Sequence, residues 1–202
     1  MTSNNSVWLI TGCSTGFGRE LARILLQRGH SVVVTARKPS TLDEFSSAEN
    51  ALVAALDVTV PGQIADVVWQ AKARFGQIDV LVNNAGYGYL SAIEEGEDDE
   101  VRAMFETNVF GLANMTKAVL PGMRERGCGH IVNISSMGGL IGFPGIGYYN
   151  ATKFAVEGLS EALAKETAPL GIKVTIVEPG PFRTDWAGRS LRTPKNAIAD
   201  YA

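Results

Sequence analysis

The sequence from residue 7 to residue 18 reads VWLITGCSTGFG, and a helical pattern from Arg19 to Arg28 follows it. Residues 7–11 are apolar enough to form a buried strand. Three glycines then allow the backbone to approach a ligand closely. The free N–H groups and the dipole at the start of a helix favour negative charge, such as that of a pyrophosphate. The stretch therefore predicts a strand, a glycine-rich phosphate-binding turn and a helix, although its Gly-x-x-x-Gly-x-Gly spacing departs from the Gly-x-Gly-x-x-Gly fingerprint.

Strand-like runs recur along the chain with helical patterns between most of them. We expect strands at Val7 to Thr11, Ser31 to Thr35, Ala51 to Leu56, Asp79 to Val82, Ile131 to Ser135 and Ile172 to Val177. This alternation predicts an α/β fold, with a parallel sheet and helices on both of its faces. The main helices after the first are expected at Pro61 to Phe75, Glu100 to Glu125 and Tyr148 to Ala168.

Composition limits the class of protein. The chain has 202 residues, which fits one domain (1–202), and its 46% hydrophobic content can build a substantial core. A net charge of −3 gives no basic footprint, so nucleic acid is not an expected partner. No apolar run approaches the roughly 18 residues of a membrane span, and Met1 to Ser6 has no secretory pattern. Two cysteines suit a reducing compartment, so we expect a cytoplasmic protein.

Tyr149 and Lys153 are four residues apart in an expected helix, which places both side chains on one face. A free tyrosine has a pKa near 10, as model peptides show. An ammonium roughly 4 Å away contributes about 4 kcal/mol at an effective dielectric constant near 20, which is about three pKa units. The pair therefore predicts a phenol whose pKa is lowered towards neutrality. The alternative is an ordinary surface pair.

Ser136 ends the run that begins at Gly129, which is apolar enough for a central buried strand. A hydroxyl at the carboxyl end of such a strand points into a cleft. In open α/β sheets, ligands bind at that edge. Ser136 is therefore a candidate for contact with the same ligand as Tyr149.

Five motifs together resemble those of the short-chain dehydrogenase/reductase family, and they occur in the order typical of that family. They are Thr11-Gly12-x-x-x-Gly16-x-Gly18, Asn83-Asn84-Ala85-Gly86, Asn108, Ser136 with Tyr149-x-x-x-Lys153, and Pro179-Gly180-x-x-x-Thr184. The resemblance spans residues 7 to about 186. It implies a doubly wound Rossmann fold and hydride transfer between a nicotinamide cofactor and a carbonyl or alcohol substrate. The chain departs from the family at its carboxyl end, where the family continues into a further helix and strand.

The resemblance assigns catalytic roles to Asn108, Ser136, Tyr149 and Lys153. Tyr149 would be the general acid in reduction and the general base in oxidation. Lys153 would lower the pKa of Tyr149 and bind the nicotinamide ribose, and Ser136 would polarise the substrate oxygen. Asparagine is a poor helix former, so Asn108 in mid-helix suggests a use. In the family a helix distortion at this asparagine holds a water that relays protons to the lysine.

The choice of cofactor depends on the residue after the second strand. An acidic residue there would bind the ribose hydroxyl, but Arg37 offers a planar, permanently charged group suited to a 2′-phosphate. In the family an arginine here accompanies NADP(H), so we expect NADP(H) rather than NAD(H). The alternative for Arg37 is a solvated side chain. The expected cofactor-binding residues are Gly12, Ser14, Thr15, Gly16, Phe17, Gly18, Arg37, Asp57, Val58, Asn84, Ala85, Gly86, Tyr149, Lys153, Pro179, Gly180 and Thr184.

Two other patterns in the sequence suggest different chemistry. Gly12 to Gly16 matches the Gly-x-Ser-x-Gly turn of serine hydrolases, but it lies on the first strand, and His30 and His130 are expected to be structural. The acidic run from Glu94 to Glu100 could suggest a metal, yet carboxylates at a helix start are usually solvated, so no metal site is expected. A nicotinamide-binding sensor without turnover and an inactive fragment are further alternatives.

The substrate and the assembly are only loosely constrained. Apolar residues after the catalytic motifs could line an apolar pocket: Tyr87, Tyr89, Met137, Ile141, Phe143, Ile146, Phe182 and Trp186. By analogy, the chain is similar to the steroid, retinoid and carbonyl reductase branch. In the family the two longest helices form dimers, which implies a homodimer or homotetramer. We also expect the natural protein to extend beyond Ala202, because Ile172 to Val177 has the composition of a strand covered on both faces.

Overall fold

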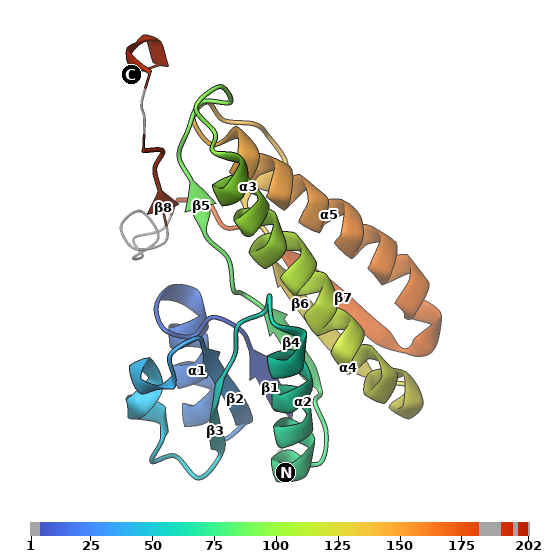
Figure 1. Cartoon of the computed structure of the whole chain (residues 1–202). Helices are drawn as coiled ribbons and strands as arrows, with labels where there is room; N and C mark the ends of the chain where they lie inside the picture. Colours follow the sequence, from blue (N-terminus) through green and yellow to red (C-terminus); the bar gives the residue numbers. More distant parts are fainter. Residues whose placement is uncertain (1–4, 182–190, 196–197, 202) are drawn as a thin grey trace.

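The computed structural model of the chain describes residues 5–181, 191–195, 198–201. Six parallel strands form one sheet in the order β3-β2-β1-β4-β6-β7 (Figure 1). The strands are β1 (Val7–Ile10), β2 (Ser31–Ala36), β3 (Ala51–Ala55), β4 (Val80–Asn83), β6 (Gly129–Ile134) and β7 (Ile172–Val177). The strand order reverses between β1 and β4, which makes the sheet doubly wound. This confirms the predicted α/β fold.

Helices cover the sheet on two sides because successive residues of a strand point to opposite faces. Leu9 of β1 packs in a core with α2 (Pro61–Phe75) and α4 (Leu112–Arg126). The next residue, Ile10, packs in a second core with α1 (Gly16–Gln27) and the 3-10 helix η1 (Pro39–Phe45). The long helix α5 (Gly147–Thr167) lies beside β7 and adds Leu163 to the first core.

One predicted helix is divided. The single helix expected from Glu100 to Glu125 consists of α3 (Asp98–Phe105), a π-helical turn η2 (Glu106–Gly111), and α4. Gly111, the last residue of this turn, packs closely against Val58: an added Cβ there would lie 2.5 Å from Val58 Cγ2. The wide turn is also the segment that carries Asn108, whose side chain is buried. The prediction of one continuous α-helix was therefore wrong, whereas a distortion at Asn108 is present.

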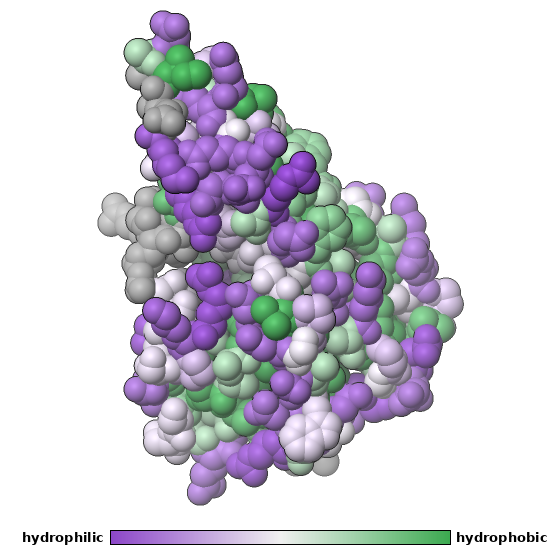
Figure 2. All heavy atoms as spheres, viewed as in Figure 1, coloured by the Kyte–Doolittle hydropathy of each residue, from purple (hydrophilic) through white to green (hydrophobic). Residues whose placement is uncertain are grey.

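The acidic run makes more contacts than expected. Glu100 lies in the first turn of α3, as predicted, but its carboxylate accepts a hydrogen bond from Arg192 Nη1 at 2.6 Å. Glu95 accepts one from Ile198 N at 2.7 Å. A short parallel pair, β5 (Gly88–Tyr89) with β8 (Leu191–Arg192), joins the same two segments. Hydrophilic residues accordingly gather around the start of α3 on the face shown in Figure 2. The acidic side chains are therefore not only solvated, as expected, but also hydrogen-bonded to the segment that contains β8.

The strand β7 differs from its expected environment. Its side chains alternate between more buried and exposed positions along Ile172–Val177, so the described residues cover one face of the strand. We had expected cover on both faces from the run of Ile, Val and Thr. Among the described helices, none is long and apolar enough to span a membrane.

Candidate active site

A cleft with a volume of about 1030 Å³ opens at the carboxyl ends of the strands, next to the reversal of strand order between β1 and β4. Most of the predicted site residues line it. They are Gly12, Ser14, Thr15, Gly16, Phe17, Arg37, Asp57, Val58, Asn84, Ala85, Gly86, Ser136, Tyr149, Lys153, Pro179 and Gly180. Gly18 and Asn108 do not line the cleft, and Thr184, Phe182 and Trp186 lie outside the described residues.

The glycine turn between β1 and α1 is closely packed on one side, against the residues that follow β4, and open on the other side. Gly12 has a positive φ of 72°, and an added Cβ there would lie 2.9 Å from Ala85 Cα. At Gly18 an added Cβ would lie 2.5 Å from Asn84 Nδ2, so this glycine serves packing rather than direct contact. At Gly16 an added Cβ would meet nothing within 4 Å. The turn can therefore accept a ligand on its open side.

Thr11 fixes the turn to β4. Its hydroxyl accepts hydrogen bonds from the backbone N–H groups of Asn84 and Ala85, both at 2.9 Å. The side chain of Asn84 in turn donates to the carbonyls of Thr11 and Gly12 at 2.8 and 2.9 Å. The motif around Asn84 is thus first of all a clamp between two strand ends, as well as part of the cleft wall.

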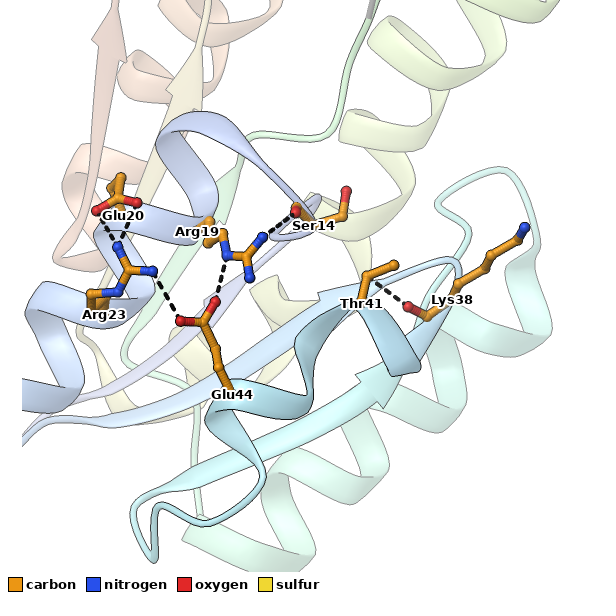
Figure 3. A network of polar contacts seen from close by, with 7 residues as sticks. All are labelled: Ser14, Arg19, Glu20, Arg23, Lys38, Thr41 and Glu44. Carbon is orange, nitrogen blue, oxygen red and sulfur yellow. Dashed lines mark hydrogen bonds and ion pairs between the residues drawn. The ribbon is translucent and has the colours of Figure 1, made fainter. Parts of the chain in front are cut away.

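The basic residues of α1 and those that follow β2 differ in their contacts. Arg19 and Arg23 are both directed at Glu44 of η1, and Arg19 also donates to Ser14 O at 3.1 Å, whereas Lys38 extends away from them (Figure 3). Arg37 lines the cleft, is exposed, and forms no ion pair with any described residue. Arg37 is therefore the guanidinium that a phosphate in the cleft could reach without breaking an ion pair.

Asp57 caps a turn. Its Oδ1 accepts hydrogen bonds from Thr59 N at 3.0 Å and Thr59 Oγ1 at 2.7 Å. Because Asp57 and Val58 also line the cleft, turn capping and contact with a ligand are compatible.

Tyr149 and Lys153 lie together at the start of α5, and each is only 7% exposed. The Lys153 ammonium lies 5.7 Å from the centre of the Tyr149 ring and donates to Ile134 O at 2.7 Å. Burial raises the pKa of Tyr149, while a hydrogen bond with the Ser136 side chain acts in the opposite direction. Burial also lowers the pKa of Lys153 to about 8. The predicted lowering of the pKa of Tyr149 is therefore not seen in this structure, where desolvation of the phenol outweighs the hydrogen bond with Ser136.

Asn108 belongs to a buried hydrogen-bond network rather than to the cleft wall. Its side chain bonds to the backbone of Tyr87 and donates to Thr152 Oγ1 at 3.2 Å. An added Cβ at Gly86 would lie 3.1 Å from Asn108 Oδ1 and 3.9 Å from Lys153 Nζ, so the amide and the ammonium flank the same glycine. Asn108 thus lies behind the cleft wall, next to Gly86 and Lys153.

Sequence reasoning missed two polar residues of α5. Asn150 donates to Gly138 O and accepts from Phe143 N, both at 2.9 Å, and so holds the loop that follows Ser136. Thr152 receives the bond from Asn108. Both are buried polar side chains within the Tyr149-x-x-x-Lys153 motif. Their polarity on the buried side of a helix was the available signal.

Comparisons with known proteins agree on one family. A family profile described as short chain dehydrogenase matches residues 6–195. The 3-ketodihydrosphingosine reductase of Bacteroides thetaiotaomicron is 46% identical over 195 residues, which is 96% of this chain and 71% of that protein. A short-chain dehydrogenase from Streptomyces avermitilis is 47% identical with a TM-score of 0.92, over 98% of this chain and 74% of that one.

Two further solved neighbours contain cofactors of different kinds. ElxO with NADP bound is 37% identical, with a TM-score of 0.85 over 90% of this chain and 75% of that one. A 3-ketoacyl-(acyl-carrier-protein) reductase from Brucella melitensis, complexed with NADH, is 32% identical with a TM-score of 0.86, over 91% and 78% of the two chains. The profile match and these relatives show that the chain belongs to the short-chain dehydrogenase family and is an oxidoreductase of that family.

Proposed function

We propose that this protein transfers a hydride between NADP(H) and the carbonyl or alcohol carbon of an apolar small-molecule substrate. The observation that carries the proposal is the shared cleft: the open glycine turn, Arg37, Ser136, Tyr149 and Lys153 all line it. A cleft of this size has room for a dinucleotide and a small substrate together.

The glycine turn fits a dinucleotide. The open space over Gly16 and the start of α1 suit a pyrophosphate, and the clamp between Thr11 and Asn84 holds the turn in place. When bound, the nicotinamide supplies the hydride chemistry. Asp57, Val58, Pro179 and Gly180 would border the rest of the cofactor.

Tyr149 acts as the general acid for reduction. Its raised pKa keeps the phenol protonated at neutral pH, which suits donation of a proton to a forming alkoxide. Ser136 bonds the phenol and is positioned to bond the same substrate oxygen. Lys153 supplies positive charge beside the phenol and would bind the ribose hydroxyls of the cofactor. Asn108 holds the backbone of Tyr87 in place. Reduction is therefore the favoured direction.

Arg37 favours NADP(H) over NAD(H). The end of β2 carries no carboxylate to bind a ribose hydroxyl, and the Arg37 guanidinium faces the cleft without an ion-pair partner among the described residues. The NADP-bound neighbour ElxO supports this choice, and the NADH-bound neighbour makes it a question for experiment.

The substrate is expected to be apolar. Met137, Phe143 and Ile146 line the cleft near Tyr149. A relative named for reduction of 3-ketodihydrosphingosine, a long-chain ketone, fits this expectation as well as the steroid, retinoid and carbonyl reductase branch does. We also expect a cytoplasmic homo-oligomer.

The deciding experiment is cofactor oxidation at 340 nm with a panel of aldehydes, long-chain ketones and steroid ketones. Turnover with NADPH and at least one apolar ketone, lost in Tyr149→Phe, is the expected result. Binding of NADPH without turnover on any member of the panel would instead support the sensor interpretation.

A further inference from the structure

Glu157 lies one helical turn after Lys153 on α5, and side chains on a helix tilt towards its amino terminus. Its carboxylate is directed at Gly139, where an added Cβ would lie 3.0 Å from Glu157 Oε1. The same added atom would lie 2.7 Å from Ser135 Oγ. The carboxylate and this hydroxyl therefore share the space that a glycine leaves beside the loop after β6.

Both groups are buried polar atoms that the catalytic scheme does not use. Ser135 Oγ and Glu157 Oε1 have no hydrogen-bond partner among the described residues. Ser135 follows Ile134, whose carbonyl accepts the hydrogen bond from Lys153 at 2.7 Å. The carboxylate, the hydroxyl and the ammonium thus lie around one strand end, just behind the cleft.

We propose that Glu157 is a positioning residue that acts through Lys153: its carboxylate stabilises the charged form of the buried ammonium, and this inference rests on the proposed function. A buried lysine without a nearby negative charge tends to lose its proton. The proposed chemistry needs Lys153 charged, because only the ammonium can attract a developing phenolate and donate to ribose hydroxyls.

The surroundings of Lys153 support this role. Burial lowers the pKa of Lys153 to about 8, and the charge of Glu157 raises it. Tyr149 and Glu157 of α5 are the titratable groups that face the ammonium within the described residues. The other elements packed there contribute uncharged groups, namely Ile134 O from β6, the Asn108 amide from η2, and Gly86.

The test compares Glu157→Gln with Glu161→Gln, a matched control at an exposed position on the same helix. Glutamine has the shape of glutamate, and Glu157 is only partly buried, so both variants are expected to fold, which thermal melting checks. The titration of Lys153 is followed by NMR of protein carrying ¹³Cε-labelled lysine, with its signal identified by its absence from Lys153→Ala.

Loss of a nearby charge should lower the midpoint of the Lys153 titration by roughly one pH unit. At pH 8 the charged fraction would then fall from about one half to about one tenth, so reduction at that pH should slow about fivefold in Glu157→Gln. The upper limb of the kcat/KM profile should move to lower pH by the same amount. Glu161→Gln should change neither measurement, and Glu157→Asp, which keeps the charge, should restore most of both.

An unmoved lysine titration in Glu157→Gln overturns the proposal, and equal shifts in Glu157→Gln and Glu157→Asp would assign the effect to packing and overturn it too. A shifted titration with an unmoved rate profile refutes the role in turnover. The lysine titration is read without turnover, so it stands apart from the proposed function, whose failure would be an inactive wild-type protein at every pH.

Discussion

Asn108 and Tyr87 exchange two hydrogen bonds: Asn108 Nδ2 donates to Tyr87 O at 2.9 Å, and Tyr87 N donates to Asn108 Oδ1 at 3.1 Å. An asparagine amide can satisfy a backbone donor and acceptor at once, which neither aspartate nor leucine can do. The pair therefore ties the π-helical turn η2 to the backbone that directly follows Gly86 in the cleft wall.

Asn108→Ala should lower the free energy of unfolding by about 2 kcal/mol or more, because it leaves buried polar groups of Tyr87 without partners. The affinity for NADPH should fall as well, since Gly86 loses its support. Urea unfolding and fluorescence titration measure the two effects. Asn114→Ala on α4 is the control and should change both much less. A variant as stable as the wild type would show that the network is dispensable.

Tyr149→Phe should bind NADPH normally while turnover falls by at least about 100-fold, the usual effect of losing a general acid. Tyr148→Phe provides the matched control, because Tyr148 is the adjacent residue and its hydroxyl donates to Ile93 O at 2.8 Å, away from the cleft. Steady-state rates and cofactor titration are measured on both. Near-normal turnover in Tyr149→Phe would refute the mechanism.

Lys153→Ala should reduce both NADPH affinity and turnover, because the ammonium is proposed to bind the ribose and to assist Tyr149. Lys165→Ala, in the last turn of the same helix, should leave both unchanged. The measurement separates the dissociation constant from kcat. A change in only one of them would show that the proposed double role is wrong.

Arg37→Asp should change the preference between NADPH and NADH by at least about tenfold in relative kcat/KM, because it removes a charged hydrogen bond and repels a 2′-phosphate. Lys38→Asp introduces the same charge one residue later, on a side chain that extends away from the Arg19–Glu44 pair (Figure 3), and should have a smaller effect. Both cofactors are titrated on all three proteins. An unchanged ratio in Arg37→Asp would show that Arg37 is only solvated.

Phe110 and Phe154 are large apolar residues, 52% and 48% exposed, on η2 and α5, the segments that family resemblance assigns to dimer contact. Phe154→Glu should convert the expected homo-oligomer into smaller species, because it would bury a charge at the interface. Ile24→Glu, at a position 44% exposed on α1, should not change the assembly. Light scattering at micromolar concentration measures both, and a monomeric wild type would contradict the prediction.

The sequence predicted the sheet and the helix Pro61–Phe75 well because their patterns are local and periodic. The strand Ile172–Val177 was predicted with its observed bounds, although its cover was not. The division between α3 and α4 was missed, because the π-helical turn depends on contacts with Val58 and Tyr87 far along the chain.

The site was predicted as a set of residues but less well in its electrostatics. Spacing placed Tyr149 and Lys153 on one face, and they do share the cleft. It could not tell how deeply the phenol is buried, which decides the direction of its pKa shift, or that the ammonium is directed at Ile134 O. Partners brought by tertiary structure, such as Glu44 for Arg19, were likewise invisible in the sequence.

The π-helical turn η2 also determines how α4 is rotated about its own axis, and so which of its side chains face the sheet. A π turn holds one residue more than an α turn, and an α-helix advances about 100° per residue. A deletion of one residue within Glu106–Gly111 would restore ordinary helix geometry but rotate α4 by about that angle. Met115, Val119 and Met123, which all pack against the sheet, would then turn out of the core. The extra residue thus sets the register with which α4 packs in the core, so length changes in this turn should harm folding before they affect chemistry.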